Sequence, residues 1–389
     1  MVLDENAKKA IALHKRLKGK IIITGKISKL RRSEIQLIYT PGVAAVCEEI
    51  YHHAGKKYEL TSKGNNVAIV TDGTRILGLG NIGPYAALPV MEGKAVLYRE
   101  FGGISAFPLC LNVTKKEEII STIKAIEPAF GAINLEDIES PKVLEISEEL
   151  ENSLSIPVFH DDRHGTSVVA LAALLNSLKL VKKQLRLIKI IVAGAGSSGY
   201  GITKLLVAAG CKNVIVTDSD GAIYKERSDN MNKYKIELSK ITNPKREKGK
   251  LADVMKNADV FIGVSGKKNL INPRLIREMG RDPIIFALTN PDPEIKPEIA
   301  KKAGAKIIAT GSYLYPNKVN NALVFPHLMR VILDRRISKI TSDLLLAAAK
   351  AIAGTISEKN LDYNNIIPDM YDKRIQKNIV QALSKLHLK

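Results

Sequence analysis

The sequence predicts an α/β fold of two domains, each a mostly parallel sheet flanked by helices, with a doubly wound second domain. Short apolar runs rich in β-branched residues alternate with longer segments of helical periodicity, which is typical of parallel sheets covered by helices. The alternation occurs on both sides of a basic segment at residues 180–189, without an internal repeat. Together with the length of 389 residues, this pattern indicates domains at residues 1–165 and 166–389.

The first half begins with helices and continues with strands. Amphipathic helices are expected over Asp4–Lys18 and Val43–His53, each followed within two residues by a glycine, a common helix terminator. The predicted strands are Val67–Thr71, Phe107–Val113, Ala132–Leu135 and Ile156–Phe159. Helices over Lys115–Ile126 and Pro141–Leu150 would fill two of the gaps between them.

The second half repeats this organisation. Its predicted strands are Leu187–Val192, Val214–Thr217, Val260–Val264, Ile284–Ala287 and Lys306–Ala309. Helices are expected over Gly199–Ala209 and Pro273–Met279, and a helix over Ser167–Leu178 would connect the two halves. From Ala322 onward we expect two long helices, a turn at Ile367–Pro368 and an amphipathic tail helix. Consecutive βα units of this kind build a doubly wound domain.

The charge of the chain is strongly positive. Lys and Arg number 59 against 40 Asp and Glu, a formal net charge of +19. Such a balance can indicate nucleic-acid binding, and a basic nucleic-acid-binding protein is the alternative from another functional class. Proteins that bind single strands usually stack bases on aromatic side chains, whereas aromatics make up only 5% here and Trp is absent. We therefore expect no nucleic-acid partner, and a positive surface that steers small anions.

No feature of the sequence indicates a membrane or an oxidising compartment. No apolar run reaches the ~18–20 residues that span a bilayer, and the N-terminus lacks the continuous apolar stretch of a signal peptide. Cys47, Cys110 and Cys211 lie far apart without C-x-x-C spacing. We therefore expect neither a disulfide framework nor a structural zinc site. We expect a cytoplasmic location and no membrane partner.

A glycine-rich loop follows the first predicted strand of the second half. Gly194, Gly196 and Gly199 have the G-x-G-x-x-G spacing, directly after a strand and before a helical segment. In that motif the glycines allow a tight turn, close approach of a pyrophosphate and close packing of the helix on the strand. The motif predicts a Rossmann-type dinucleotide site, whose candidate loop residues are Gly194, Ala195, Gly196, Ser197, Ser198 and Gly199.

Asp218 closes the next predicted strand, 19 residues after Gly199. A carboxylate at this position holds the ribose 2′-hydroxyl, which favours NAD over NADP. Four basic residues follow closely and could receive a 2′-phosphate instead: Lys225, Arg227, Lys233 and Lys235. A solvated helix face is the simpler interpretation of those four, so NAD is the preferred cofactor and NADP the alternative.

Two acidic pairs follow predicted strands of the first half, Glu136 with Asp137 and Asp161 with Asp162. Neighbouring residues on a regular strand point to opposite faces, so adjacent acids can share one ion only where the strand has ended. Because parallel strands end at one edge of a sheet, the pairs would converge there and suit a hard cation such as Mg²⁺ or Mn²⁺. Helix capping with salt bridges to Arg163 explains the same residues equally well. His160 and His164 could indicate zinc, but the oxygen ligands outnumber them.

Several motifs, in order along almost the whole chain, resemble those of the malic enzymes. Besides the glycine loop they are Tyr39–Ala44, Thr71–Gly73, Leu77–Asn81, Pro89–Lys94, Asn134–Asp137, His160–Thr166, Phe261–Ser265, Asn290–Pro291 and Tyr315–Asn321. The resemblance implies a substrate- and metal-binding domain over residues 1–165 and an NAD(P)-binding domain over 166–389. It further implies metal-dependent oxidative decarboxylation of L-malate to pyruvate and CO₂, with oxaloacetate decarboxylation as a side activity.

Site residues follow from the same resemblance. Tyr39 would be the general acid and Lys94 the general base, with Asp161 orienting Lys94. The metal ligands would be Glu136, Asp137 and Asp162. Substrate would be bound by Arg75, Lys94, Asn290, Asn320 and Asn321, with Asn290 also beside the nicotinamide of the cofactor. Lys94 is expected to be neutral, since burial and a nearby metal charge both lower the pKa of an amine.

The sequence also departs from the family pattern in places. Ser105 stands where the family often has Asp, Gly311–Leu314 replaces a polar approach to Tyr315, and Lys318 stands where Gln is common. A malolactic enzyme, which converts malate to lactate, would use the same residues and is an alternative outcome. Another dehydrogenase would share the α/β plan without needing two acid pairs on one sheet edge. Because the family forms dimers and the terminal helices offer apolar faces, we expect a homodimer.

Overall fold

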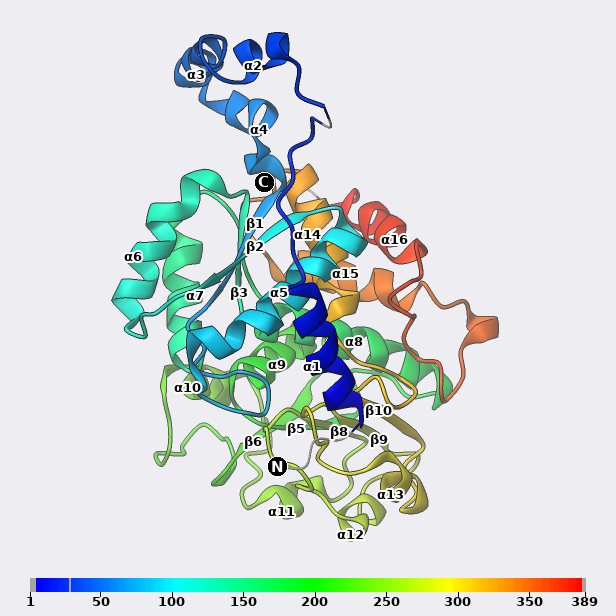
Figure 1. The fold of residues 1–389 in the computed structure, drawn as a ribbon. Coiled ribbons are helices and arrows are strands. Elements are labelled where there is room, and N and C mark those ends of the chain that lie inside the picture. The colour runs from blue at the N-terminus through cyan, green and yellow to red at the C-terminus, as the bar shows by residue number, and fades with distance from the viewer. Residues whose placement is uncertain (1–4, 28, 387–389) are drawn as a thin grey trace.

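The structure is a computed structural model that describes residues 5–27 and 29–386. It has two parallel sheets with helices on both faces of each, as the sequence predicts (Figure 1). The predicted helix at Asp4–Lys18 corresponds to α1 (Glu5–Leu17), and its first residue, Asp4, lies outside the described residues. Among the helices described, none is long and apolar enough to cross a membrane.

The first sheet has four strands in the order β2-β1-β3-β4, all parallel. Their bounds are β1 (Asn66–Thr71), β2 (Ser105–Cys110), β3 (Ala132–Leu135) and β4 (Val158–His160). Alternate residues of β1 enter different cores: Ala68 and Val70 pack with α6 (Lys116–Ile126) and α7 (Lys142–Ser153). The opposite face, covered by α5 (Gly83–Gly102), joins a core that continues into the second sheet.

The second sheet has six strands in the order β10-β9-β8-β5-β6-β7. Their bounds are β5 (Lys189–Ala193), β6 (Asn213–Asp218), β7 (Gly221–Ala222), β8 (Val260–Gly263), β9 (Ile284–Ala287) and β10 (Ile307–Thr310). All pairs are parallel except β6 with the short β7. One face is covered by α11 (Leu251–Met255), α12 (Pro273–Arg277) and α13 (Pro297–Lys302). The other is covered by α8 (Asp161–Leu180), α9 (Ser197–Ala208) and α10 (Lys233–Ile241).

Both sheets place their first strand inside the sheet. β1 lies between β2 and β3, and β5 lies between β6 and β8. At such a point the loops leaving neighbouring strands diverge, which opens a crevice beyond their carboxyl ends where α/β proteins bind ligands. The fold therefore provides two ligand crevices, one after β1 and β3 and the other after β5 and β8.

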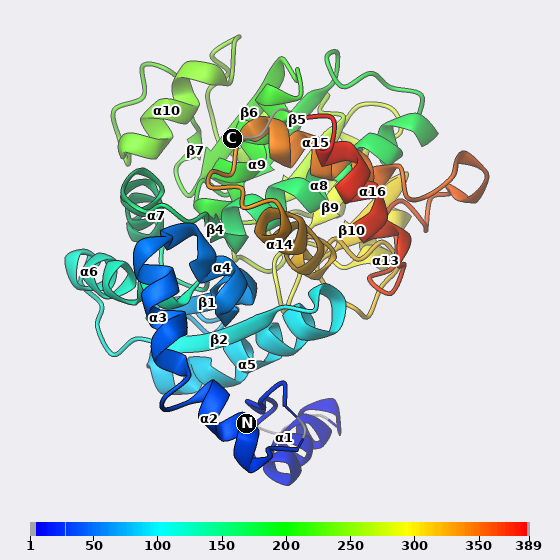
Figure 2. The ribbon, with the colours of Figure 1, turned by 90° about the horizontal axis from the view of Figure 1, so that it is seen from above.

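The C-terminal segment packs across both halves of the molecule (Figure 2). It contains α14 (Phe325–Asp334), α15 (Ser342–Ala353) and α16 (Arg374–Leu383). The ring of Phe325 lies 4.7 Å from that of Tyr98 on α5, so this segment reaches the first domain. The short 3₁₀ helices of the chain are η1 (Ala54–Lys56), η2 (Ser62–Asn65), η3 (Glu127–Ala129), η4 (Asn321–Leu323) and η5 (Glu358–Asn360).

Some predicted boundaries were wrong. β2 covers residues 105–110 rather than 107–113, and the antiparallel strand β7 was not predicted. The connecting helix α8 begins at Asp161, six residues before its predicted start, so the second acid pair occupies the first turn of a helix. The helices α14 and α15 are shorter than expected, with 10 and 12 residues. The predicted division of the chain at residue 165 stays a prediction.

The N-terminal segment forms an arm of α1, α2 (Arg32–Ile38), α3 (Val43–His52) and α4 (Lys57–Leu60). In Figure 1, α2 and α3 lie at the end of the molecule opposite to the six-stranded sheet. None of the described residues in these four helices is buried. Several large apolar side chains of the arm are therefore exposed, including Ile22, Ile23, Leu37 and Ile38.

Candidate active site

The crevice of the first sheet contains a buried lysine between two carboxylates. Lys94 lies on α5 and is 7% exposed. Its Nζ is 2.5 Å from Asp161 Oδ2 and 2.6 Å from Glu136 Oε2, and it lies 4.1 Å from the centre of the Phe325 ring. The structure thus brings together three residues that the sequence placed on one helix and after two different strands.

The contacts of Lys94 act on its pKa in opposite directions. Burial lowers the pKa of Lys94, but the charges of Asp161 and Glu136 outweigh burial, and the pKa of the amine lies above its ordinary value. The sequence placed Asp161 beside Lys94 but did not include Glu136 among its contacts. The neutral amine expected beside a bound metal stays a prediction.

The remaining acids of the cluster are half-buried and lie close to one another. Burial raises the pKa of Glu136, although the charge of Lys94 opposes it. Burial and the nearby charge of Asp162 raise the pKa of Asp137 to about 7. Burial also raises the pKa of Asp162, against the opposing charge of Arg75. Each carboxylate is held close to others of the same charge, an arrangement that a bound cation would stabilise.

Two oxygen atoms of the cluster have no hydrogen-bond partner in the described part of the chain, although both are buried: Asp137 Oδ2 and Asp161 Oδ1. Buried acceptors are normally satisfied, so such orphaned oxygens favour a missing donor or cation. Asp137 also has a positive φ of 49°, and its carbonyl accepts from the amide of Arg75 at 3.1 Å. This backbone turn directs the chain away from β3 immediately after the acid pair.

Within residues 5–27 and 29–386, no three His, Cys, Asp or Glu side chains are arranged as a complete metal-binding group. Lys94 Nζ contacts both Glu136 and Asp161 and so bridges these two acids. The donor chemistry nevertheless fits a hard divalent cation, because all the acidic donors are carboxylate oxygens and two of them are unpartnered.

The two histidines that could have indicated zinc are both buried, and burial lowers the pKa of each, so both are neutral at pH 7. His164 Nδ1 is 3.2 Å from the backbone amide of His160, and its Nε2 is 2.9 Å from Nε of Arg163. Both nitrogens of His164 are thus engaged. Its role here is to hold Arg163 and the start of α8.

The predicted substrate amides occupy different positions. Asn321 joins the cluster, since its Nδ2 donates to Asp161 Oδ2 at 3.2 Å. Asn320 caps η4 instead, with its Oδ1 accepting from the amide of Ala322 at 2.9 Å. Asn290 lies in the loop after β9, next to Gly311. A Cβ built on Gly311 would be 2.6 Å from Asn290 Nδ2. Of the three, only Asn321 contacts the lysine–carboxylate cluster by a hydrogen bond in the described structure.

Arg75 lies between the two crevices. It follows β1. Burial raises the pKa of both Asp137 and Asp162, and the positive charge of Arg75 opposes that rise. Its Nη1 would be 3.6 Å from a Cβ built on Gly196, in the glycine loop of the second domain. This position allows one guanidinium group to interact with an anion bound in either crevice.

Tyr39 is not near this cluster. It follows α2 in the N-terminal arm and is 70% exposed. Among the described contacts of the chain, none joins its hydroxyl to Lys94 or to the carboxylates. The structure therefore assembles the predicted base and acidic residues within one chain, but not the predicted acid.

Sequence reasoning missed a hydrogen-bonded chain behind the cluster. Tyr98 Oη donates to Asn134 Oδ1 at 2.6 Å, and Asn134 Nδ2 donates to Glu136 Oε2 at 3.0 Å. Both Tyr98 and Asn134 are fully buried. A polar residue inside the apolar strand β3, two residues before an acid pair, was the signal that could have identified Asn134.

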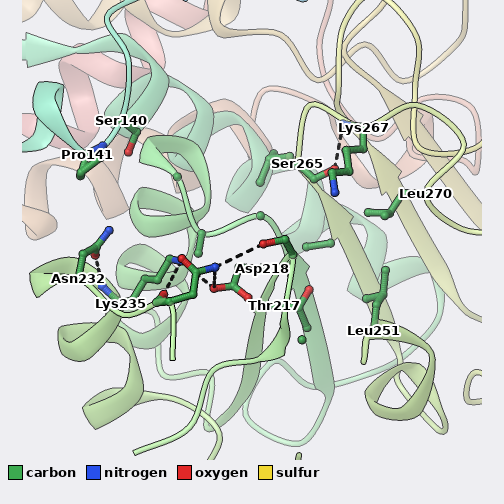
Figure 3. Close-up of a pocket in the computed structure, with 18 of the residues that line it drawn as sticks. Ser140, Pro141, Thr217, Asp218, Asn232, Lys235, Leu251, Ser265, Lys267 and Leu270 are labelled. Carbon is green, nitrogen blue, oxygen red and sulfur yellow. Dashed lines mark hydrogen bonds and ion pairs between the residues drawn. The ribbon is translucent and has the colours of Figure 1, made fainter. Parts of the chain in front are cut away.

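The second crevice contains a cavity of about 580 Å³, a size typical of cofactor sites (Figure 3). It is lined by the glycine loop, by Asp218 and by Lys235, with Ser265 and Leu270 on the opposite side. Figure 3 shows Asp218 and Lys235 directed toward one another at one end of it. Ser197, at the start of α9, is buried.

The glycines of the loop have distinct surroundings. Gly194 has a φ of +120°, which disfavours other residues. A Cβ on Gly199 would be 1.8 Å from the carbonyl oxygen of Gly194, so the helix packs directly on the strand. A Cβ on Gly196 would meet its nearest neighbour, Arg75 Nη1, only at 3.6 Å. The backbone at Gly196 is thus open toward the cavity, where a pyrophosphate could approach it.

Comparison with known proteins identifies both halves of the chain. The family model described as "Malic enzyme, N-terminal domain" matches residues 18–151, and "Malic enzyme, NAD binding domain" matches residues 164–386. The chain is 46% identical over 376 residues to a bifunctional malic/malolactic enzyme of Bacillus subtilis, covering 97% of this chain and 92% of that protein. It is 49% identical over 365 residues to an NAD-dependent malic enzyme of Geobacillus stearothermophilus, covering 94% and 76%.

Solved structures agree. The chain superposes on the crystal structure of an NAD-dependent malic enzyme from Thermotoga maritima with a TM-score of 0.93 and 45% identity, covering 99% of this chain and all of that one. In sequence, the chain is also 40% identical to an NADP-dependent malic enzyme of Escherichia coli, but it spans only 50% of that longer protein. With both halves matched, the lysine–carboxylate cluster in one and the glycine loop in the other, the chain belongs to the malic enzyme family of NAD(P)-dependent oxidoreductases.

Proposed function

We propose that this chain catalyses the oxidative decarboxylation of L-malate to pyruvate and CO₂, with reduction of NAD or NADP and a requirement for a divalent cation. The observation that carries the proposal is the buried Lys94, in contact with Asp161 and Glu136 at the edge of the first sheet. Relatives named as malic enzymes support it. Decarboxylation of added oxaloacetate is the expected side activity.

The cation would be held by Glu136, Asp137 and Asp162, as the sequence suggested. Their burial, raised pKa values and the orphaned Asp137 Oδ2 support this assignment. Mg²⁺ and Mn²⁺ suit such oxygen donors best. When bound, the cation would supply Lewis acidity toward the substrate oxygens, and the dinucleotide would supply the hydride acceptor.

Lys94 would move the proton of the malate C2 hydroxyl. To accept it, the amine must first be neutral, although Asp161 and Glu136 stabilise its charge. A carboxylate engaged with a dication stabilises the ammonium less, so the burial of Lys94 would then dominate and lower its pKa. Asp161 would keep the amine in place, and Asn321 would fix Asp161 through the hydrogen bond at 3.2 Å. The Phe325 ring, 4.1 Å from Nζ, keeps bulk water from one side of the amine.

The two carboxylates of malate need cationic or amide partners. Arg75 would bind one of them, because it lies beside Asp137 and Asp162 and faces Gly196 of the glycine loop. Asn290 would contact substrate and nicotinamide from the loop after β9. Asn320, which caps η4, would act through the backbone it holds rather than by direct contact.

The general acid would come from a second copy of the chain. The arm that carries Tyr39 exposes several large apolar side chains, with Ile22 at 84% and Ile23 at 79% exposed, and neighbouring exposed apolar residues favour an interaction surface. We propose that the arm packs on a second copy in a homodimer and that Tyr39 there protonates C3 beside the partner's lysine–carboxylate cluster.

Mixing two inactive variants tests this arrangement. Each of Lys94→Ala and Tyr39→Phe should lack activity as a homodimer. If Tyr39 acts on the partner, coexpression of the two gives mixed dimers in which one site has both a lysine and a tyrosine, so part of the activity returns. If both residues act within one chain, no mixed dimer contains a complete site, and no recovery would overturn the shared arrangement.

The reaction itself is tested by incubating the protein with L-malate, Mn²⁺ and NAD or NADP, and following reduced cofactor together with pyruvate and lactate by NMR. Pyruvate and reduced cofactor in equal amounts are expected. Lactate without net reduction of cofactor would indicate the malolactic outcome, which the Bacillus subtilis relative's name makes the second candidate. The kcat of Lys94→Ala should fall at least a thousandfold. Lys124→Ala, a surface control on α6, should keep its kcat. Near-native malate oxidation by Lys94→Ala would refute the assignment of Lys94 as the base.

A further inference from the structure

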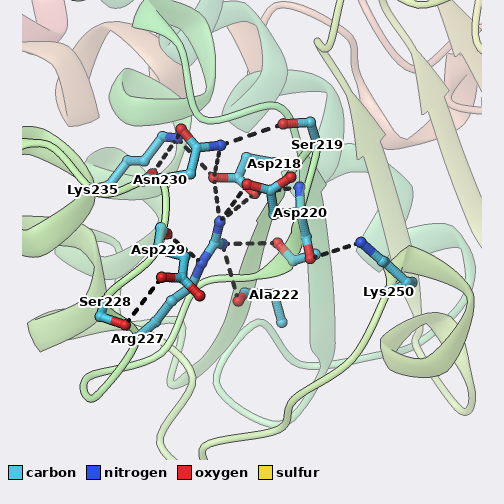
Figure 4. A network of polar contacts seen from close by, with 11 residues as sticks. Asp218, Ser219, Asp220, Ala222, Arg227, Ser228, Asp229, Asn230, Lys235 and Lys250 are labelled. Carbon is cyan, nitrogen blue, oxygen red and sulfur yellow. Dashed lines mark hydrogen bonds and ion pairs between the residues drawn. The ribbon is translucent and has the colours of Figure 1, made fainter.

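The ribose end of the cofactor cavity contains an acid whose acceptor positions are already filled. Asp218 Oδ1 accepts from Nη2 of Arg227 at 2.8 Å and from the amide of Asp220 at 2.9 Å. Its Oδ2 accepts from the same Nη2 at 2.9 Å and from Lys235 Nζ at 2.7 Å (Figure 4). Asn230 Nδ2 adds a longer contact at 3.4 Å. A carboxylate that selects NAD needs free lone pairs for the ribose hydroxyls, and Asp218 has few left.

The negative charge of Asp218 is also compensated. The side chains of Arg227, Lys235 and Asp218 are 6%, 12% and 8% exposed, so their interactions are only weakly screened by water. Asp220 approaches Arg227 only at 3.7 Å and is half-exposed, while the Lys250 ammonium donates to its carbonyl at 3.2 Å. The sum over these five side chains is three positive and two negative charges. The repulsion by which an unpaired acid excludes a 2′-phosphate is therefore reduced here.

The two cations differ in how firmly they are fixed. Arg227 also donates to the carbonyls of Gly221, Ala222 and Asp229, so it is part of the loop's framework. Among the described residues, the Lys235 ammonium donates to Asp218 and to Asn230, and Lys235 lines the cavity. Its ammonium can turn from Asp218 to an added anion by rotation of its own side chain. Ser219, Asn232 and Lys250 line the same end of the cavity and offer further donors.

The other basic residues considered from the sequence do not reach this end. Lys233 forms an ion pair with Glu148 at 2.6 Å, on the surface facing α7, and Lys225 is exposed. The interpretation of the four basic residues as a solvated helix face is thus wrong for Arg227 and Lys235, because the side chains of both are mostly covered and pair with Asp218.

We propose that this cavity accepts the 2′-phosphate of NADP, with Lys235 as the residue that binds it, so that the chain uses NADP at least as well as NAD despite Asp218. Arg227 is a positioning residue that neutralises Asp218 and holds the loop. The inference rests on the dinucleotide site of the proposed function and specifies its ligand.

Equilibrium binding to the full chain, without malate, tests the inference separately from catalysis. Isothermal titration with NAD, NADP, 2′,5′-ADP and 5′-AMP compares ligands that differ by the 2′-phosphate. We expect NADP to bind as tightly as NAD or more tightly, and 2′,5′-ADP to bind at least tenfold more tightly than 5′-AMP. Lys235→Gln should weaken NADP and 2′,5′-ADP at least tenfold and NAD less than threefold. Lys233→Gln, the same change two residues earlier, is the matched control and should alter neither.

Two results would overturn the inference: weaker binding of NADP than of NAD by the unaltered protein, or an equal loss for both cofactors in Lys235→Gln. If neither dinucleotide binds at all, the inference and the proposed function fail together. If NADP binds as expected but malate is not oxidised, only the proposed function fails. A melting temperature for Lys235→Gln within 2 °C of the unaltered protein, checked first, ensures that weak binding is not caused by unfolding.

Discussion

Removing one hydroxyl behind the active site tests whether the buried chain from Tyr98 to Asn134 positions Glu136. In Tyr98→Phe the ring stays, and with it the packing on Phe325 at 4.7 Å. The substitution deletes only the donor to Asn134 Oδ1, a hydrogen bond of 2.6 Å between two fully buried groups. Asn134 then keeps its bonds to the Leu135 carbonyl at 3.1 Å and to Glu136 at 3.0 Å, but its Oδ1 no longer has the donor that holds the amide in this orientation.

The expected size of the effect follows from this geometry. A buried acceptor left without a partner costs ~1–3 kcal/mol, because the site has no water to replace the lost donor. For a domain of about 150–250 residues, at about 2–4 °C per kcal/mol, that corresponds to a fall in melting temperature of about 2–12 °C. Because Asn134 is the hydrogen-bond partner of Glu136, a proposed metal ligand, the Mn²⁺ concentration for half-maximal activity should rise about tenfold.

Thermal unfolding followed by circular dichroism, and malate oxidation across a series of Mn²⁺ concentrations, measure the two effects. Tyr85→Phe is the matched control, because Tyr85 lies on the same helix and is 85% exposed. It should change neither quantity. If Tyr98→Phe melts like the control and needs no more Mn²⁺, the hydrogen-bonded chain does not position Glu136 and the reasoning is wrong.

Three further predictions use other parts of the structure. Gly196→Ala should weaken NAD binding at least tenfold in a titration but keep the melting temperature, because the new Cβ would approach no atom closer than 3.6 Å. Gly199→Ala should weaken NAD binding and also lower the melting temperature, because its Cβ would be 1.8 Å from the carbonyl oxygen of Gly194. His327 is buried and burial lowers its pKa from 6.5 to about 4, so protonation favours the unfolded chain. Stability should be full above pH 6.5 and fall by up to about 3 kcal/mol as the pH drops to 4, and urea titrations should show a smaller fall in His327→Leu. A chelator should abolish malate oxidation, and Mn²⁺ at a hundred times its dissociation constant should restore it and add ~2.7 kcal/mol to the unfolding free energy; activity that persists after chelation would contradict the metal assignment.

Much of the fold could be predicted because its signals are local. The strand β3 has the predicted bounds, since a short apolar run between turns leaves little choice, and the glycine loop lies between β5 and α9 as its spacing indicates. The two-residue strand β7 has no periodicity to detect. The start of α8 was missed because Asp161 and Asp162 resemble capping residues, whereas both belong to the helix itself.

The candidate site was less predictable, because its properties depend on contacts between distant segments. Lys94 and the acids could be proposed from their motifs, but not the close contacts that raise the pKa of the amine. The pairing of Asp218 with Arg227 and Lys235 depends on how the loop after β7 folds back, which no spacing rule describes. Tyr39 has a recognisable motif and yet lies far from Lys94 in the single chain, since the position of an arm is set by what it packs against.

The helix α8 has a consequence for how the protein could be divided. Its first turn carries Asp161 and Asp162, while its middle, from Val168 to Leu174, is buried among residues of both sheets and of α15. A fragment cut at residue 165 would keep these acids but lose the buried turns that orient them. The two halves therefore cannot be exchanged between relatives as independent modules: a chimaera needs its crossover beyond α8, or it must take α8 together with both surfaces that enclose it.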